Sequence, residues 1–178
     1  DLNEFIKLIT KINKNEKFLQ CLNISCILMY MIYFSLIIIS FLINDFELNK
    51  IKILFLLTIC VLTDIGGYAF GKTIGGKKLT KISPNKTYSG VIGSFIFPIF
   101  FGLIFYYYQQ DLIVLKTKLF FLIIITSVLS QIGDLIISAM KRKAKIKDTG
   151  SFLPGHGGIL DRIDGILLAL PIGIIIIG

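Results

Sequence analysis

The stretch LFFLIIITSVLSQIGDLIIS, residues 119–138, decides the fold class of this chain. It is 20 residues long, and its only charged side chain is Asp134. A helix of about 20 apolar residues crosses the ~30 Å hydrocarbon core of a bilayer, and a helix satisfies its own backbone hydrogen bonds there. The stretch therefore predicts a transmembrane helix, and the lysine-rich run after it marks the exit from the membrane.

Four further apolar segments have similar length, and they cover residues 22–43, 53–71, 90–108 and 163–178. Across all 178 residues, 54% are hydrophobic and 17% are charged, and the mean hydropathy is +0.81. This composition excludes an ordinary soluble enzyme, in which about one quarter of residues are charged, and it excludes intrinsic disorder. We predict an all-α, polytopic integral membrane protein with about five transmembrane helices and two basic cytoplasmic loops.

We expect residues 1–178 to form one membrane domain, with N-terminal spans in 18–71 and an informative region in 55–178. The first residue is Asp1 rather than Met, which is compatible with a truncated N-terminus.

Basic residues are confined to the segments between the apolar stretches, and the net charge is +8. They gather before the first stretch, in the loop 72–89 and in the loop 139–162. With five spans these regions fall on one side, which the positive-inside rule makes cytoplasmic, so the C-terminus faces outward. The charge then favours an anionic lipid surface or an anionic substrate over nucleic acid.

Acidic residues at membrane depth are the sharpest functional signal. Five of them lie within the spans or at their cytoplasmic ends: Asp64, Asp134, Asp148, Asp161 and Asp164. An ionised Asp near the bilayer centre costs on the order of 3 kcal/mol, so such residues are usually paired or functional. Pairing with nearby Lys and Arg is the structural alternative for any one of them.

Spacing predicts that several of these residues converge. Asp134, Ser138, Lys141, Arg142 and Lys145 are offset by 4, 7, 8 and 11 residues, which places them on one stripe of a helix. Asp161 and Asp164 share a face of the next span, and the loop KDTGSFLPGHGG, residues 147–158, is rich in glycine. Carboxylates suit Mg²⁺ and basic side chains suit phosphate, so the pattern predicts a site for a metal–polyphosphate complex.

A second phosphate motif is a decoy. GGYAFGKT, Gly66–Thr73, satisfies the P-loop pattern G-x-x-x-x-G-K-[ST] but ends an apolar span, with no room for a neighbouring sheet. We therefore expect its glycines to serve close helix packing or a tight exit turn.

The segment SAMKRKAKIKDTGSFLPGHGGILDRID, Ser138–Asp164, resembles the C-terminal signature of the phosphatidate cytidylyltransferases, also called CDP-diacylglycerol synthases. A second block that resembles the family comprises Asp64, Gly71-Lys72 and Ser83-Pro84-Asn85-Lys86-Thr87. The resemblance covers roughly residues 55–178. It departs from the family at Tyr88-Ser89, where many members have an aromatic residue and Glu.

The resemblance implies transfer of CMP from CTP to phosphatidic acid, giving CDP-diacylglycerol and pyrophosphate. It also implies a multi-pass enzyme of the bacterial inner membrane whose site faces the cytoplasm. It further implies a homodimer that requires Mg²⁺, with K⁺ as an assisting cation, and no nucleic-acid partner.

On the positions that match the family, the predicted metal ligands are Asp134, Asp161 and Asp164. The predicted catalytic residues are Asp134, Lys141, Arg142, Lys147, Asp148, Asp161, Arg162 and Asp164. The predicted substrate-binding residues are Asp64, Lys72, Ser83, Lys86, Thr87, Ser138, His156, Gly157 and Gly158. His156 is equally compatible with donating to a phosphate and with fixing its own loop.

Three other functions remain open on sequence alone. A CDP-alcohol phosphotransferase uses a different aspartate signature, which this chain lacks. A cytidylyltransferase for another lipid phosphate, such as an archaeal ether lipid, shares the chemistry. A transporter would carry its polar residues near mid-bilayer along a pathway, whereas here they gather at one face.

Overall fold

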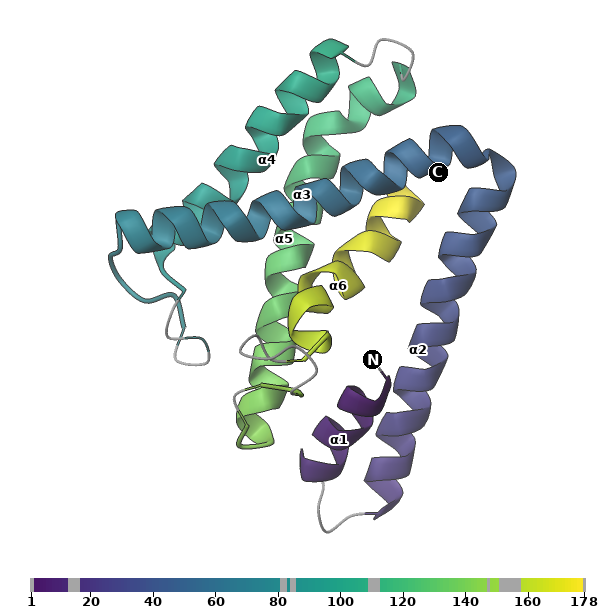
Figure 1. Cartoon of the computed structure of the whole chain (residues 1–178), viewed down its shortest axis with the longest axis vertical. Coiled ribbons are helices and arrows are strands. Elements are labelled where there is room, and N and C mark those ends of the chain that lie inside the picture. The colour runs from purple at the N-terminus through teal and green to yellow at the C-terminus, as the bar shows by residue number, and fades with distance from the viewer. Residues whose placement is uncertain are drawn as a thin grey trace.

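The computed structural model describes residues 2–12, 17–80, 83, 86–108, 113–146, 148–150 and 158–177. They form six helices (Figure 1): α1 Leu2–Ile12, α2 Lys17–Asn44, α3 Phe46–Thr73, α4 Tyr88–Tyr108, α5 Ile113–Lys143 and α6 Leu160–Ile177. The described part of the chain contains no β-strand, only one isolated bridge between Lys78 and Thr87. The all-α prediction is confirmed, although α1 was not predicted.

Four of these helices are long and apolar enough to cross a membrane, over Gln20–Asn44, Phe46–Thr73, Tyr88–Tyr108 and Lys118–Lys143. They contain four of the five expected spans, which indicates a multi-pass membrane protein. The expected span 163–178 lies in α6, which has 18 residues and carries Asp161, Arg162 and Asp164 near its start. These charges set α6 apart from the four longer apolar helices.

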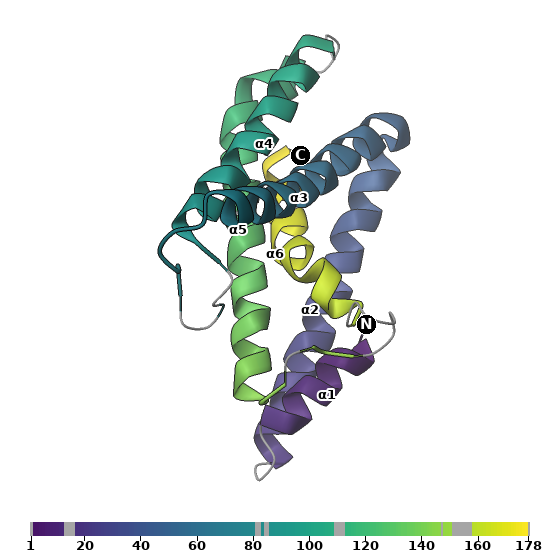
Figure 2. The same cartoon turned by 60° about the vertical axis from the view of Figure 1, so that its left-hand side comes forward.

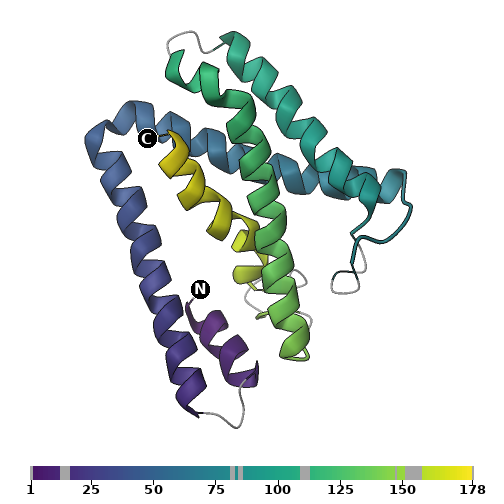
Figure 3. The ribbon, with the colours of Figure 1, turned by 180° about the vertical axis from the view of Figure 1, so that it is seen from behind.

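The helices form two closely packed pairs, α3 with α4 and α5 with α6. Helix α3 runs obliquely across α5 and α6, as opposite views show (Figures 1 and 3). Leu56 and Ile59 of α3 pack there with Leu122 and Ile123 of α5 in a fully buried core. Helix α2 exposes large apolar side chains such as Met29, Ile32 and Leu36, as expected of a surface in contact with lipid.

Glycines permit the close approach of α3 and α4. A Cβ atom on Gly66 would lie 2.9 Å from the carbonyl carbon of Gly93 and 3.3 Å from the Cα of Ser94. The P-loop-like stretch Gly66–Thr73 is helical to its end within α3. The expectation that its glycines serve helix packing is therefore confirmed.

A second crossing of small residues joins α5 to α6. A Cβ atom on Gly133 would lie 2.7 Å from the carbonyl oxygen of Asp164, and one on Gly165 would lie 3.0 Å from the carbonyl oxygen of Ser130. Asp134 and Asp164 each adjoin one of these glycines in sequence. The crossing therefore sets the distance at which the two acidic residues face each other.

The end of α5 turns the chain back toward α6. Ile146 N donates to Lys141 O at 3.0 Å and Lys145 N donates to Arg142 O at 3.1 Å, which is the Schellman pattern. Lys145 takes the left-handed position with φ 56°, where glycine is usual. This turn directs residues 148–150 toward the start of α6.

Helix α1 packs its apolar face on the same region. Phe5 belongs to a buried cluster with Ile137 of α5 and with Leu160 and Leu167 of α6. Rotated views place α1 near the start of α6 (Figure 2). The N-terminal helix is thus part of the structure around the acidic residues.

Candidate active site

A cavity of about 320 Å³ lies among α3, α4, α5, α6 and the connection between α3 and α4. Its polar lining consists of Thr63, Asp64, Tyr68, Ser83, Lys86, Thr87, Ser94, Gln131, Asp134, Asp161 and Asp164. Four carboxylates and one ammonium group therefore share one hollow. The predicted convergence of acidic residues is confirmed for Asp134, Asp161 and Asp164, and Asp64 joins them.

Asp134 is at the centre of this arrangement. Its Oδ2 forms an ion pair with Nζ of Lys86, and Oγ of Ser138 donates to its Oδ1 at 3.2 Å. Asp64 and Asp164 both interact electrostatically with Asp134. One ammonium group thus faces a cluster of carboxylates that would otherwise repel one another.

Local hydrogen bonds hold the segment that carries Lys86. Leu79 N donates to Lys86 O at 2.7 Å, and Lys86 N donates to Ser83 O at 3.1 Å. Thr87 Oγ1 accepts from Gly90 N at 3.1 Å, which is an N-cap contact at the start of α4. The Ser83–Thr87 block therefore places one cation in the cavity and begins a helix.

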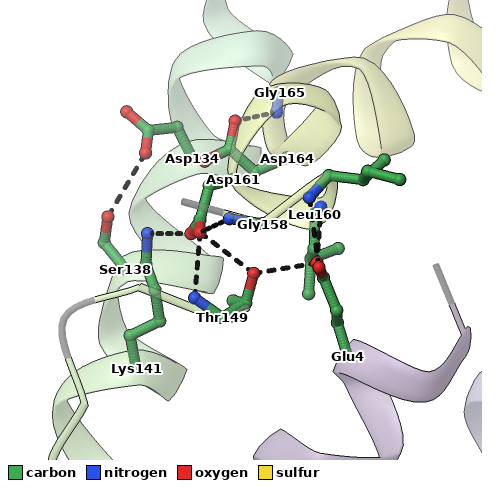
Figure 4. A network of polar contacts seen from close by, with 11 residues as sticks. Glu4, Asp134, Ser138, Lys141, Thr149, Gly158, Leu160, Asp161, Asp164 and Gly165 are labelled. Carbon is green, nitrogen blue, oxygen red and sulfur yellow. Dashed lines mark hydrogen bonds and ion pairs between the residues drawn. The ribbon is translucent and has the colours of Figure 1, made fainter. Parts of the chain in front are cut away.

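Asp161 is held by a separate set of donors (Figure 4). Lys141 Nζ lies 2.7 Å from its Oδ1, and its Oδ2 accepts from Thr149 N at 2.9 Å and from Gly158 N at 3.0 Å. Asp161 lies before the apolar stretch 163–178, outside the segment that was expected to span the membrane. Burial raises the pKa of its carboxyl, but these hydrogen bonds outweigh burial and bring the pKa below its usual value. Asp161 is consequently an anion at neutral pH.

The Lys141–Asp161 pair is largely buried, with side-chain exposures of 12% and 11%. We expect Lys141→Met to lower the free energy of unfolding by about 3 kcal/mol, because it leaves a buried carboxylate without its counter-charge. Unfolding in detergent with added denaturant measures this change. Lys143→Met, at an exposed position on the same helix, is the control.

A double variant separates the pair from general packing. Lys141→Met with Asp161→Asn should lose less stability than the sum of the single losses, because the two groups interact directly. Strictly additive losses would contradict the coupling.

Sequence comparison identifies the family. Residues 3–178 match the model of the cytidylyltransferase family. The chain belongs to the cytidylyltransferase family.

Individual relatives agree with this membership. The chain is 43% identical over 124 residues to the phosphatidate cytidylyltransferase of Staphylococcus saprophyticus, covering 67% of this chain and 46% of the relative. It is 40% identical over 137 residues to that of Brucella suis, covering 76% and 50%, and 39% identical over 132 residues to that of Bacillus subtilis, covering 70% and 48%. The chain thus spans about half the length of the curated relatives it matches.

The structure gathers only part of the site expected from the cytidylyltransferase resemblance. Asp64, Ser83, Lys86, Thr87, Asp134, Asp161 and Asp164 line the cavity. Ser138 bonds Asp134, and Gly158 is buried against Asp161. Lys141 does not line the cavity; its ammonium group pairs with Asp161, which does.

Four other predicted residues are solvent-exposed and do not line the cavity: Lys72, Arg142, Asp148 and Arg162. Lys72 bonds the hydroxyl of Tyr68 at 3.2 Å, and Tyr68 does line the cavity. Lys147, His156 and Gly157 lie outside the described residues.

Sequence reasoning missed Glu4, Thr63 and Gln131. Thr63 and Gln131 line the cavity as neutral residues within apolar helices, where nothing in the sequence distinguishes them. Glu4 shares the buried face of α1 with Phe5 and Leu8. An acidic residue on the apolar face of an amphipathic helix was the available signal.

The donor set fits a hard cation. Carboxylate oxygens suit Mg²⁺, which commonly takes one or two protein carboxylates and completes its coordination with water and substrate phosphates. No group of three acidic, His or Cys side chains within the described ranges is arranged to hold an ion unaided. Asp161 was predicted as a third ligand, but both of its carboxylate oxygens are bonded to Lys141, Thr149 and Gly158. Asp134 and Asp164, with phosphate oxygens, therefore suit Mg²⁺ better than the predicted set of three.

Proposed function

We propose that this chain carries the catalytic centre of a phosphatidate cytidylyltransferase, which transfers CMP from CTP to phosphatidic acid and releases pyrophosphate. One observation carries the proposal: a cytidylyltransferase-family chain builds a cavity where Asp134, Asp164 and Lys86 meet. Carboxylates for a cation and an ammonium group for phosphate are the functional groups that a metal–nucleotide substrate requires.

The reaction is an in-line displacement. A phosphate oxygen of phosphatidic acid attacks the α-phosphorus of CTP, and the bond to the β-phosphate oxygen breaks. The nucleophile is already an anion, so the site needs no strong general base. Its task is to position two anions and to compensate their charge, as in other phosphoryl-transfer enzymes.

Each wall of the cavity has a part in this proposal. Asp134 and Asp164 are the proposed cation ligands, and Mg²⁺ supplies charge neutralisation of the triphosphate when bound. Lys86 and the hydroxyl groups of Ser83 and Thr87 bind phosphate oxygens. Asp161 fixes the start of α6 through Lys141, Thr149 and Gly158.

Other cations predicted from the sequence are assigned to the same substrates. Lys72 and Arg142, which are exposed, are proposed to attract the nucleotide or the lipid headgroup. The same role is proposed for Lys147 and His156, which lie outside the described residues. The assisting role of K⁺ and the assembly into a homodimer stay proposals that rest on the family resemblance. Mass measurement of the detergent-solubilised protein tests the dimer.

Orientation follows from charge. We propose the bacterial inner membrane, with the cavity facing the cytoplasm. The basic end of α5 and Lys86 lie on the side where lysines outnumber acids in the loops. In a variant whose native Cys21, Cys26 and Cys60 are replaced by Ser, a single cysteine is introduced at Lys78 or at Lys50. Labelling of each in intact cells with membrane-impermeant reagents distinguishes the two faces.

The test is transfer of radiolabelled cytidylate into a lipid-soluble product. Purified protein receives CTP, Mg²⁺ and phosphatidic acid, and Asp161→Asn is assayed alongside. We expect product from the wild type and at least about 10-fold less from Asp161→Asn, because the start of α6 loses an anionic anchor. An archaeal-type ether lipid phosphate as the sole accepted acceptor would redirect the assignment, and absence of both product and CTP binding would reject it.

A further inference from the structure

Glu4 of α1 is buried, although it lies far in sequence from every other acidic residue of the site. The residue is 6% exposed. Its Oε2 accepts from Leu160 N at 2.8 Å and from Thr149 Oγ1 at 2.9 Å, and its Oε1 accepts from Ile159 N at 3.2 Å. The carboxylate of α1 therefore caps the first turn of α6.

Thr149 connects Glu4 to Asp161. Its hydroxyl oxygen lies 2.9 Å from Glu4 Oε2 and 3.0 Å from Asp161 Oδ2, and its backbone N–H donates to the same Asp161 oxygen. Figure 4 shows the two carboxylates on either side of this hydroxyl group. A displacement of Glu4 would thus displace Asp161 through one intervening residue, Thr149.

The fit around Glu4 is tight. Cβ atoms placed on Gly150 or Gly158 would collide with its carboxylate. Both segments that flank residues 151–157 therefore contact the same side chain, one through Thr149 and Gly150 and the other through Gly158 and Leu160.

We propose that Glu4 is a positioning residue of the active site. It holds the start of α6 and residues 149–150 together, so that Asp161 keeps its orientation and Asp164, one turn later, faces Asp134. The proposal rests on the proposed function for its kinetic consequence, whereas its structural consequence is independent of catalysis. Glu4 itself does not line the cavity.

The test variant is Glu4→Gln, which keeps the side-chain shape but removes the charge and one acceptor oxygen. We expect kcat to fall between about 10- and 100-fold, because a displacement of about 1 Å costs that much. The KM for CTP should change little, whereas the unfolding midpoint should fall somewhat, because one buried donor loses its acceptor oxygen. Lys7→Gln, on the exposed side of α1, is the matched control and should retain wild-type kcat.

Amide hydrogen exchange distinguishes a positioning role of Glu4 from a role as a helix cap alone. Ile159 and Leu160 amides bond Glu4, whereas Thr149 and Gly158 amides bond Asp161. Positioning predicts that Glu4→Gln accelerates exchange of all four. Acceleration confined to Ile159 and Leu160, with unchanged kcat, would show a cap only and overturn the proposal.

Thr149→Val tests the same link from its other end if Glu4→Gln fails to accumulate. It removes the bridging hydroxyl group but keeps the shape, and it should lower kcat to a similar extent. The double variant should be no worse than the poorer single variant, because both act through one connection. If the wild type transfers no cytidylate, the proposed function fails, while the spread of exchange to Thr149 and Gly158 still decides the positioning role.

Discussion

Asp134→Asn is expected to abolish cytidylyl transfer while leaving the helices folded. Asp134 is the carboxylate that interacts with Lys86, Ser138, Asp64 and Asp164 at once. Asparagine has the same size and can still accept from Ser138. It cannot balance the Lys86 ammonium group and is a poor ligand for Mg²⁺, so we expect a loss of at least ~100-fold in kcat.

The measurement is formation of lipid-soluble cytidine product at saturating CTP and Mg²⁺. Glu47→Gln makes the same chemical change at an exposed position near the start of α3, where its partner Lys50 lies at 3.8 Å, and it should keep full activity. Circular dichroism and elution in detergent should match the wild type for both variants. An Asp134→Asn protein that retained more than a tenth of the wild-type rate would remove Asp134 from the proposed cation site.

Gly66→Ala is expected to have the largest effect on stability of any single methyl group added to α3. The new Cβ atom would meet backbone atoms of Gly93 and Ser94, and backbone cannot yield as a flexible side chain can. The α3–α4 pair would have to separate. Overpacking of this kind costs about 1–3 kcal/mol, and Asp64 would shift relative to Lys86 and Thr87.

Gly67→Ala is the matched control, one residue further along the same helix. Its Cβ atom would lie 3.6 Å from the Cβ of Ser94 and 3.7 Å from the carbonyl oxygen of Gly90, which are ordinary contacts. Alanine also has a higher helix propensity than glycine, so this variant should be as stable as the wild type or more so. Equal unfolding midpoints for the two variants would contradict the close crossing.

The sequence allowed accurate prediction of those features that depend on local pattern. The five apolar stretches became helices because length and hydropathy are local properties, and the stripe from Asp134 to Ser138 to Lys141 followed from helical geometry. The packing role of Gly66 could be inferred from its place at the end of a span.

Features that depend on long-range contacts were not predictable. The spacing placed Lys141 and Arg142 on the same stripe of a helix, and both were predicted to be catalytic. In the structure, Lys141 pairs with Asp161 from another helix, whereas Arg142 is exposed. Lys86 was predicted to bind substrate. Pairing with a basic residue was the alternative for each aspartate, but no sequence pattern identified Lys86 as the partner of Asp134. The amphipathic pattern of α1 could have singled out Glu4, but its partners, more than 140 residues away, could not be predicted.

The contact between Glu4 and Leu160 joins residues 156 positions apart, which bears on how the protein is made. During translation α1 to α5 leave the ribosome before α6, so Glu4, Lys141 and Asp134 enter the membrane region without Asp161 and Asp164. Contacts of such high sequence separation form late in folding, because the intervening chain must be ordered first. A nascent chain that stops before residue 159 therefore contains Glu4 without the two backbone amides that it caps and Lys141 without its carboxylate partner.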